Sequence, residues 1–257
     1  MNSRALWIAF SGLACKEVRR VFRIWVQTLL PSAITITLYF LIFGWVIGSR
    51  VGMMDGVSYM AYITPGLIMM PVITNAYANV VSSFFGARFN RSIEELLVSP
   101  MPSWLILMGY LSGGVVRGLV NGLIVSVIGA VLSGIHVQHP VLMLVTIAIC
   151  SVLFSLLGFI NGMFARKFDD LSIVTTFLLT PLIYLGGVFY SIHSLPPFWR
   201  MVSMVNPVHY IIEAFRYTMI GIGGDSYGWS MMVICLLTVG IFILSHEILR
   251  RGIRIKS

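Results

Sequence analysis

Charged side chains are scarce in this chain: Asp, Glu, Lys and Arg together make up 10% of its 257 residues. A soluble domain carries roughly 25%. Hydrophobic residues reach 58%, and the mean hydropathy is +0.94. So little polar surface cannot cover a core in water, and most of the chain must therefore be surrounded by lipid. The composition predicts an integral membrane protein and excludes a soluble domain.

Lysine is scarcer still and occurs only at positions 16, 167 and 256. A P-loop needs a glycine directly before its lysine, because its backbone amides must wrap around the phosphates. The residues that precede the three lysines are Cys15, Arg166 and Ile255. The chain therefore has no nucleotide site of this type. If it takes part in ATP-driven work, ATP and Mg²⁺ are bound by another subunit.

The residue patterns of common metal and catalytic sites are also missing. The three cysteines, at positions 15, 150 and 235, form no CxxC pair, and there is no GxSxG or HExxH motif. The five histidines lie near the predicted ends of apolar segments, which favours interfacial hydrogen bonding over a haem pair inside a bundle. We therefore expect no enzyme activity, metal or cofactor in this chain.

The net charge of +8 does not indicate nucleic-acid binding, because the basic residues form small clusters between apolar runs. With both termini in the cytoplasm, 13 of the 17 Lys and Arg residues lie on the cytoplasmic side and three on the outer side. The reverse orientation would oppose the positive-inside bias of membrane proteins. We expect both termini to be cytoplasmic.

Six apolar runs are each near the roughly 20 residues that a helix needs to cross the hydrocarbon of a bilayer. They cover residues 25–47, 59–81, 104–132, 140–164, 171–190 and 229–249. The chain is thus predicted to be an all-α membrane protein with six transmembrane helices, in one domain over residues 25–257.

Residues 1–24 precede this domain and have the pattern of an amphipathic helix. Leu6, Phe10, Leu13 and Glu17 recur at steps of three and four, while most of the basic residues point elsewhere. A basic helix with an apolar side is typical of the membrane interface. We predict an interfacial helix here.

Residues 196–223 are too apolar for a plain loop and too short in each half to span the membrane. The pair Asn206-Pro207 divides them into two helical stretches, which predicts a re-entrant hairpin in the outer leaflet between spans five and six. The alternative is an amphipathic helix lying on the outer surface. Glu213 and Arg216 are three residues apart, so we expect them to pair on one helix face.

Arg117 is the one ionisable residue near the middle of a span, and it needs a partner or water there. Asn121 lies one turn on and can accept from the guanidinium, forming a buried polar clamp; a contact with substrate is the alternative. Small residues repeat nearby, which lets helices pack closely in lipid. They are Gly114, Gly118 and Gly122 in span three, and Ser151, Ser155, Gly158 and Gly162 in span four.

Two other spans carry polar residues that a lipid-facing helix would not keep. Span two has Asn75 and Asn79, and span five has Thr176, Thr180 and Tyr184. These two spans are therefore our candidates for a translocation path.

The segment 88–99 after span two is predicted to form a short charged helix at the cytoplasmic surface. Ser92 can cap this helix, with Glu95 three residues on, and Pro100 ends it. Its apolar residues share a face beside the acids, which suits docking into a groove of a partner; the alternative is a helix lying on the membrane. The residues considered for docking are Arg88, Arg91, Glu94, Glu95, Leu96, Leu97 and Val98.

Two motifs resemble those of the type-2 ABC transporter permeases. The run Arg91-x-x-Glu94-Glu95-Leu96-Leu97-Val98-Ser99-Pro100-Met101-Pro102 is similar to their coupling-helix signature. The hairpin residues Asn206-Pro207-x-x-Tyr210 with Phe215-Arg216 resemble the same family. The likeness covers the whole chain and is greatest to the bacterial YadH branch, near the nodulation-factor exporter permeases.

This resemblance implies a homodimer of permeases in the bacterial inner membrane, in contact with membrane lipids and bound to two copies of an ABC ATPase subunit. It implies that the helix around residues 94–98 fits a groove of the ATPase and that the complex exports an amphipathic or lipid-linked substrate. The rival is an ion-coupled secondary transporter, which predicts acids or histidines deep inside the spans.

Overall fold

The computed structural model describes residues 3–252, apart from the side chains of residues 97, 224 and 225. It is almost entirely helical. The α-helices are α1 (Ser3–Arg23), α2 (Trp25–Tyr39), α3 (Gly48–Val51), α4 (Tyr59–Phe89), α5 (Ser92–Val98), α6 (Ser103–Ser133), α7 (Pro140–Phe164), α8 (Phe168–Val174), α9 (Thr180–Leu185), α10 (Pro197–Val205), α11 (Pro207–Ile220) and α12 (Gly224–Arg251). Two π-helical segments, η1 (Phe40–Ile47) and η2 (Thr175–Leu179), a 3₁₀ turn, η3 (Ile192–Ser194), and two short strands, β1 (Met53–Met54) and β2 (Val57–Ser58), complete it.

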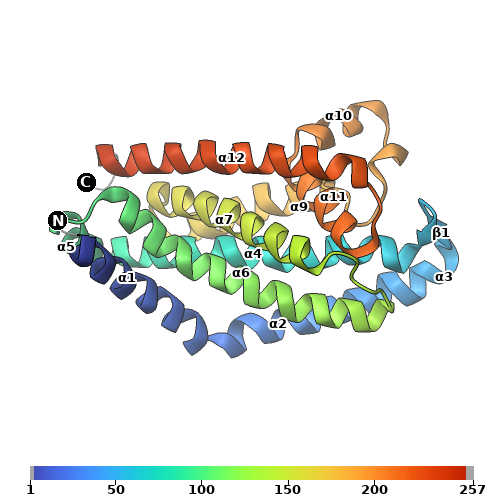
Figure 1. Cartoon of the computed structure of the whole chain (residues 1–257), viewed down its shortest axis with the longest axis horizontal. Coiled ribbons are helices and arrows are strands. Elements are labelled where there is room, and N and C mark those ends of the chain that lie inside the picture. The colour runs from blue at the N-terminus through green and yellow to red at the C-terminus, as the bar shows by residue number, and fades with distance from the viewer. Residues whose placement is uncertain (1–2, 253–257) are drawn as a thin grey trace.

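Six helical segments of the described chain are long and apolar enough to cross a membrane. They cover Trp25–Val51, Tyr59–Phe89, Ser103–Ser133, Pro140–Phe164, Phe168–Leu185 and Ser226–Arg251. The predicted all-α fold with six spans is confirmed. Helix α1 begins and α12 ends at the same end of the bundle, which also holds α5, while the β1–β2 hairpin and α10 lie at the other end (Figure 1).

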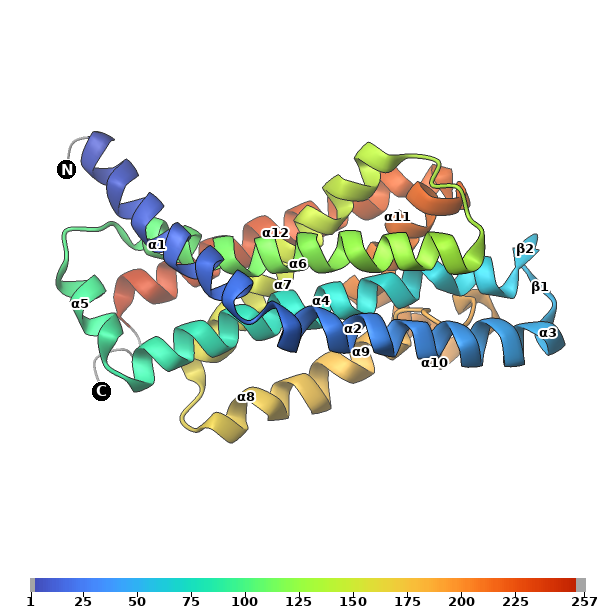
Figure 2. The ribbon, with the colours of Figure 1, turned by 90° about the horizontal axis from the view of Figure 1, so that it is seen from below.

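The bundle is built around α4, which packs against both α6 and α7. In the apolar parts of α4 and α7, 61% and 56% of the residues are buried within the chain, against 11% in the α8–α9 span. The α8 end of that span stands away from the other helices (Figure 2). The inner helices therefore form a packed core, and the outer ones are left to lipid or to a partner.

Small residues explain how the inner helices approach so closely. Gly114 and Gly118 of α6 face the hydroxyls of Ser155 and Ser151 of α7, as the small stripes predicted. Gly158 of α7 turns instead toward α4, where a Cβ at this position would lie 2.5 Å from the Tyr77 carbonyl oxygen. The backbones of α4 and α7 are thus in direct contact, which no larger residue at position 158 would permit.

The helix predicted over residues 1–24 is present as α1, and it packs along α6. Its buried residues are Leu13, Glu17 and Val21, while Trp7 is 67% exposed. One side of the helix is therefore attached to the bundle and the other is free to meet the membrane interface.

The predicted break between two short helices at Asn206 is also confirmed. The Asn206 side-chain oxygen caps α11 by accepting from the Val208 amide at 3.0 Å. Its side-chain amide donates to the Leu182 carbonyl at 2.6 Å, so the same residue ties the break to α9. Helix α11 is largely buried against α4, α7 and α12, whereas α10 carries exposed apolar side chains.

The segment predicted as one helix over residues 88–99 is divided in the structure. Helix α4 continues to Phe89, a turn follows, and α5 covers only Ser92–Val98. The predicted cap is wrong, because Arg91 precedes α5 in the left-handed region (φ 59°) and the Ser92 hydroxyl donates backwards to the Ala87 carbonyl at 3.1 Å. A two-residue turn therefore joins α5 directly to the central helix.

The contact between α4 and α7 can be tested with Gly158→Ala. The added methyl group has no room against a backbone oxygen, and we expect a loss of roughly 1–3 kcal/mol of stability. Thermal unfolding in detergent micelles measures this loss. Gly240→Ala in α12 is the matched control, because a Cβ at Gly240 meets nothing within 4 Å. Equal unfolding temperatures for the two variants would contradict the close contact.

Candidate functional site

Arg117 is held by α4 and not by its own helix. Its Nε and Nη2 both donate to the Asn75 side-chain oxygen, at 3.2 and 2.8 Å. The predicted clamp between Arg117 and Asn121 is therefore wrong as a direct bond. Asn121 instead donates to the Ser32 hydroxyl of α2 at 3.2 Å, and Asn75 donates to the same hydroxyl at 3.1 Å. Ser32 thus joins three helices, and the sequence analysis missed it.

A second polar cluster attaches α1 to α4. The Ser83 hydroxyl donates to Glu17 at 2.7 Å, and Arg20 lies 3.3 Å from the same carboxylate oxygen. Arg20 also donates to the side-chain oxygen and the backbone oxygen of Asn79, both at 2.8 Å. Glu17 is completely buried, although the sequence analysis treated it as one position of an amphipathic stripe. An acid within the apolar stripe of a helix was the signal for this site.

These two clusters form what we call the interior polar network, made of Glu17, Arg20, Ser32, Asn75, Asn79, Ser83, Arg117 and Asn121. In this network, every hydrogen bond between two different helices has a side-chain or backbone atom of α4 as one partner. The one exception is the bond from Asn121 of α6 to Ser32 of α2. Polar groups in lipid remain stable only when such partners are present. The network therefore fixes how three helices sit against α4.

The candidate translocation residues are not brought together within one chain. Asn75 and Asn79 belong to the interior polar network, whereas Thr176 and Tyr184 are exposed on the α8–α9 span. Thr180 is half-buried and donates to the Thr175 carbonyl at 2.9 Å. No hydrogen bond or ion pair in the described part of the chain links the two sets.

A groove of about 230 Å³ lies between α2 and α4, directly beside the network. Hydroxyls of Ser32, Thr35 and Thr74 line it together with apolar side chains such as Leu67 and Met70. This mixture of hydroxyls and apolar side chains suits an amphipathic molecule, because its polar part can bind the hydroxyls while its apolar part packs against the apolar side chains.

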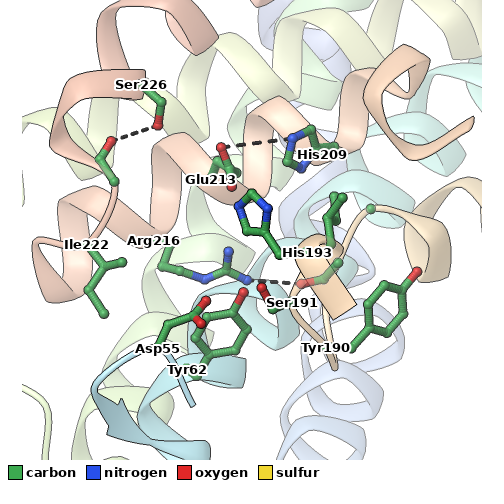
Figure 3. Close-up of a pocket in the computed structure, with 14 residues that line it drawn as sticks. Asp55, Tyr62, Tyr190, Ser191, His193, His209, Glu213, Arg216, Ile222 and Ser226 are labelled. Carbon is green, nitrogen blue, oxygen red and sulfur yellow. Dashed lines mark hydrogen bonds and ion pairs between the residues drawn. The ribbon is translucent and has the colours of Figure 1, made fainter. Parts of the chain in front are cut away.

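A cavity of about 270 Å³ lies at the end of the bundle opposite α5, and its lining carries charged side chains (Figure 3). Arg216 is 5% exposed, donates to the Gly187 carbonyl at 3.0 Å and lies 4.0 Å from the centre of the Tyr62 ring. The predicted pairing of Glu213 with Arg216 is therefore not formed. Arg216 contacts Gly187 and Tyr62 instead, and the Glu213 carboxylate lies 3.9 Å from the His209 ring nitrogen. Burial lowers the pKa of His209, while the nearby Glu213 carboxylate opposes that shift.

The other hairpin residues named from the sequence lie around the same helices. The Tyr210 hydroxyl donates to the Met204 carbonyl at 2.8 Å and so closes α10 onto α11, and Pro207 is the first residue of α11. Arg216 lies on α11, lines the cavity and donates to the Gly187 carbonyl in the loop that follows α9. The sequence motif is thus a set of internal contacts that hold the hairpin in shape.

Helix α5 presents a different surface from the one expected. Its apolar residue Ile93 is 1% exposed and Leu96 packs beside it, so the apolar face holds α5 to its own chain. The exposed side carries Glu94, Glu95 and Val98, of which Val98 is 88% exposed. The side chain of Leu97 lies outside the described residues.

Two arginines near α5 differ in how they are used. Arg88 belongs to α4 and donates to the Met163 and Ala165 carbonyls at 2.6 and 3.0 Å, which fixes the end of α4 to the end of α7. Arg91 is exposed in the turn before α5. Arg91 is therefore the more exposed of the two, and Arg88 is half-buried.

Asn75→Leu tests the interior polar network, because it removes the acceptor of Arg117. We expect a loss of roughly 1.5–3 kcal/mol of stability, the range for hydrogen bonds to charged groups. Adding Arg117→Met should restore part of this loss, since the unpaired charge is then gone. Unfolding in micelles measures both variants, and a double variant no more stable than Asn75→Leu would argue against the pairing.

Comparison with known proteins agrees with this architecture. The family model of the ABC-2 type transporter matches residues 8–220. The inner membrane transport permease YadH of Escherichia coli (strain K12) is 51% identical over 251 residues, which cover 98% of each chain. Nodulation protein J of Rhizobium leguminosarum bv. viciae is 26% identical over 206 residues, which cover 80% of each chain.

The resemblance inferred from the two motifs is thereby confirmed at the level of the family. The match spans α1 to α11, so it includes the central helix, α5 and the hairpin. The chain belongs to the ABC-2 type transporter family and is a membrane transport permease.

Proposed function

We propose that this chain is the membrane-spanning subunit of an exporter in which two copies pair with two copies of a separate ABC ATPase. The observation that carries the proposal is α5: a short helix, joined to the central helix by a two-residue turn, with an exposed acidic side. ATP and Mg²⁺ bind to the ATPase, in keeping with the absence of a P-loop in this sequence.

The bacterial inner membrane is the proposed location, with α5 and both termini in the cytoplasm. The name of the relative from Escherichia coli supports the inner membrane. The excess of Lys and Arg near the α5 end of the bundle supports the orientation.

The contacts around α5 support a specific route by which a movement of the ATPases would reach the membrane helices. A displacement of α5 would move α4 through the turn at Asn90–Arg91. The hydrogen bonds of Arg88 to the Met163 and Ala165 carbonyls would move the end of α7 with it. The contacts of Glu17 and Arg20 with α4 carry α1 along. Closure of the two ATPases would therefore move α1, α4 and α7 together.

The proposed path runs between two copies of the permease. In this arrangement the hydroxyl-lined groove of α2 and α4 faces the moving molecule, together with exposed Thr176 and Tyr184 and half-buried Thr180 of the α8–α9 span. Such mixed surfaces suit an amphipathic or lipid-linked substrate that leaves the cytoplasm or the inner leaflet.

The rival function is ion-coupled transport, and Glu17 is the observation that favours it, because it is a completely buried acid. Glu17 is, however, bonded to Ser83 and lies beside Arg20, so its charge is already balanced. It also lies on α1, outside the six spans. Family membership and this pairing both favour the ATP-driven exporter.

Charge reversal on α5 tests the proposed docking surface. Glu94→Lys with Glu95→Lys should abolish most of the stimulation of ATP hydrolysis by the permease while the unfolding temperature stays unchanged, because both side chains are exposed. ATPase assays of the reconstituted complex measure this stimulation. Asp169→Lys, an exposed acid at the start of α8, is the matched control. Full stimulation by the double variant would contradict docking through this face.

The orientation can be tested with single cysteines in a background that lacks the three natural ones. Met53→Cys, on the exposed β1 strand, should react with an impermeant thiol reagent added to intact cells. Val98→Cys on α5 should react only after the membrane is opened. The reverse labelling pattern would overturn the proposed topology.

A further inference from the structure

A second hollow, of about 200 Å³, lies beside α5 between the end of α4 and the connection from α7 to α8. We call it the arginine pocket. Its charged lining consists of Arg88, Arg91, Arg166 and one acid, Glu94. The side chains that face the hollow therefore carry a net positive charge.

Much of this positive charge has no partner inside the chain. Both hydrogen bonds of Arg88 come from one nitrogen, Nη1, which binds backbone carbonyls. The guanidinium groups of Arg91 and Arg166 make no hydrogen bond or ion pair with any residue that the structure describes. Arg216 in the cavity at the opposite end differs, because its guanidinium donates to the Gly187 carbonyl and lies over the Tyr62 ring.

Aromatic rings border the arginine pocket. Phe85, which lines it, lies 4.9 Å from Phe168, and Phe168 lies 5.0 Å from Phe89, measured between ring centres. Phe89 and Phe168 are 61% and 58% exposed. Phe89 ends one candidate span and Phe168 begins another, so these rings lie where the hydrocarbon of a bilayer meets its polar surface.

We propose that the arginine pocket binds the phosphate of an anionic phospholipid from the inner leaflet, with its acyl chains against Phe89 and Phe168. Guanidinium groups bind phosphate oxygens in pairs, and basic pockets between membrane helices on the cytoplasmic side suit anionic headgroups. The exposed rings favour a lipid over a soluble anion, because a free phosphate gains nothing from them. The proposal relies on the orientation proposed above, with this end of the bundle in the cytoplasm.

A bound lipid would add a link between two parts of the chain at this end. Arg91 belongs to the turn that carries α5, and Arg166 belongs to the connection that begins α8. One phosphate between them links the proposed docking helix to the loosely packed α8–α9 span. Anionic lipid should therefore stabilise the permease beyond what neutral lipid does.

The experiment uses the purified full chain in phosphatidylcholine nanodiscs, to which phosphatidylglycerol is added. Native mass spectrometry should show one retained phosphatidylglycerol per chain, and thermal unfolding should shift upward. Arg166→Gln should weaken this binding roughly fivefold or more, the effect of one surface arginine. Arg166 lies outside the proposed docking surface, so a loss of lipid with normal ATPase stimulation separates this proposal from the proposed function.

Two controls decide the result. Arg19→Gln removes an exposed charge from α1 on the same side and should leave the retained lipid unchanged; an equal loss would show non-specific attraction and overturn the proposal. Phe168→Ala should weaken phosphatidylglycerol binding, and glycerol phosphate at millimolar concentration should not displace the lipid. Displacement by glycerol phosphate, together with normal binding by Phe168→Ala, would assign the pocket to a soluble anion instead.

Discussion

Arg117 can lie within an apolar helix only because Asn75 on the neighbouring helix accepts two of its hydrogen bonds. An unpaired guanidinium in the apolar interior of a membrane costs about 2.5 kcal/mol or more. The same asparagine binds Ser32, so one side chain sets the distance between α2, α4 and α6. The positions of the outer helices thus depend on a polar contact near the centre.

The central helix α4 makes contacts that hold neighbouring helices in place along its whole length. Its middle carries the asparagines of the interior polar network, its sides meet glycines of α6 and α7, and its end leads into α5. Because dispersion and hydrogen bonds replace the hydrophobic effect between helices in lipid, this close approach is what holds the core together. The proposed docking helix is therefore attached to the most firmly packed element of the chain.

Features that depend on neighbouring residues in the sequence were predictable. The six spans follow from the length of apolar runs, and the break in the hairpin follows from Asn206 and Pro207. The Asn75 partner of Arg117 and the Ser83 partner of Glu17 were not, because they come from helices more than 40 residues away and no local pattern selects them. The face of α5 was misjudged for a related reason. Amphipathicity shows that Ile93 and Leu96 share a side, but not whether that side meets a partner or the same chain.

Gly158 has a consequence for how this permease can change shape. With the backbone of α7 lying directly on the Tyr77 carbonyl, α4 and α7 have no side chains between them at this point that could rearrange and let one helix slide past the other. The two must travel as one rigid body. Any opening of the molecule then has to occur where the helices are held loosely, along α2, the α8–α9 span and α12, whose apolar parts are only 11–17% buried within the chain.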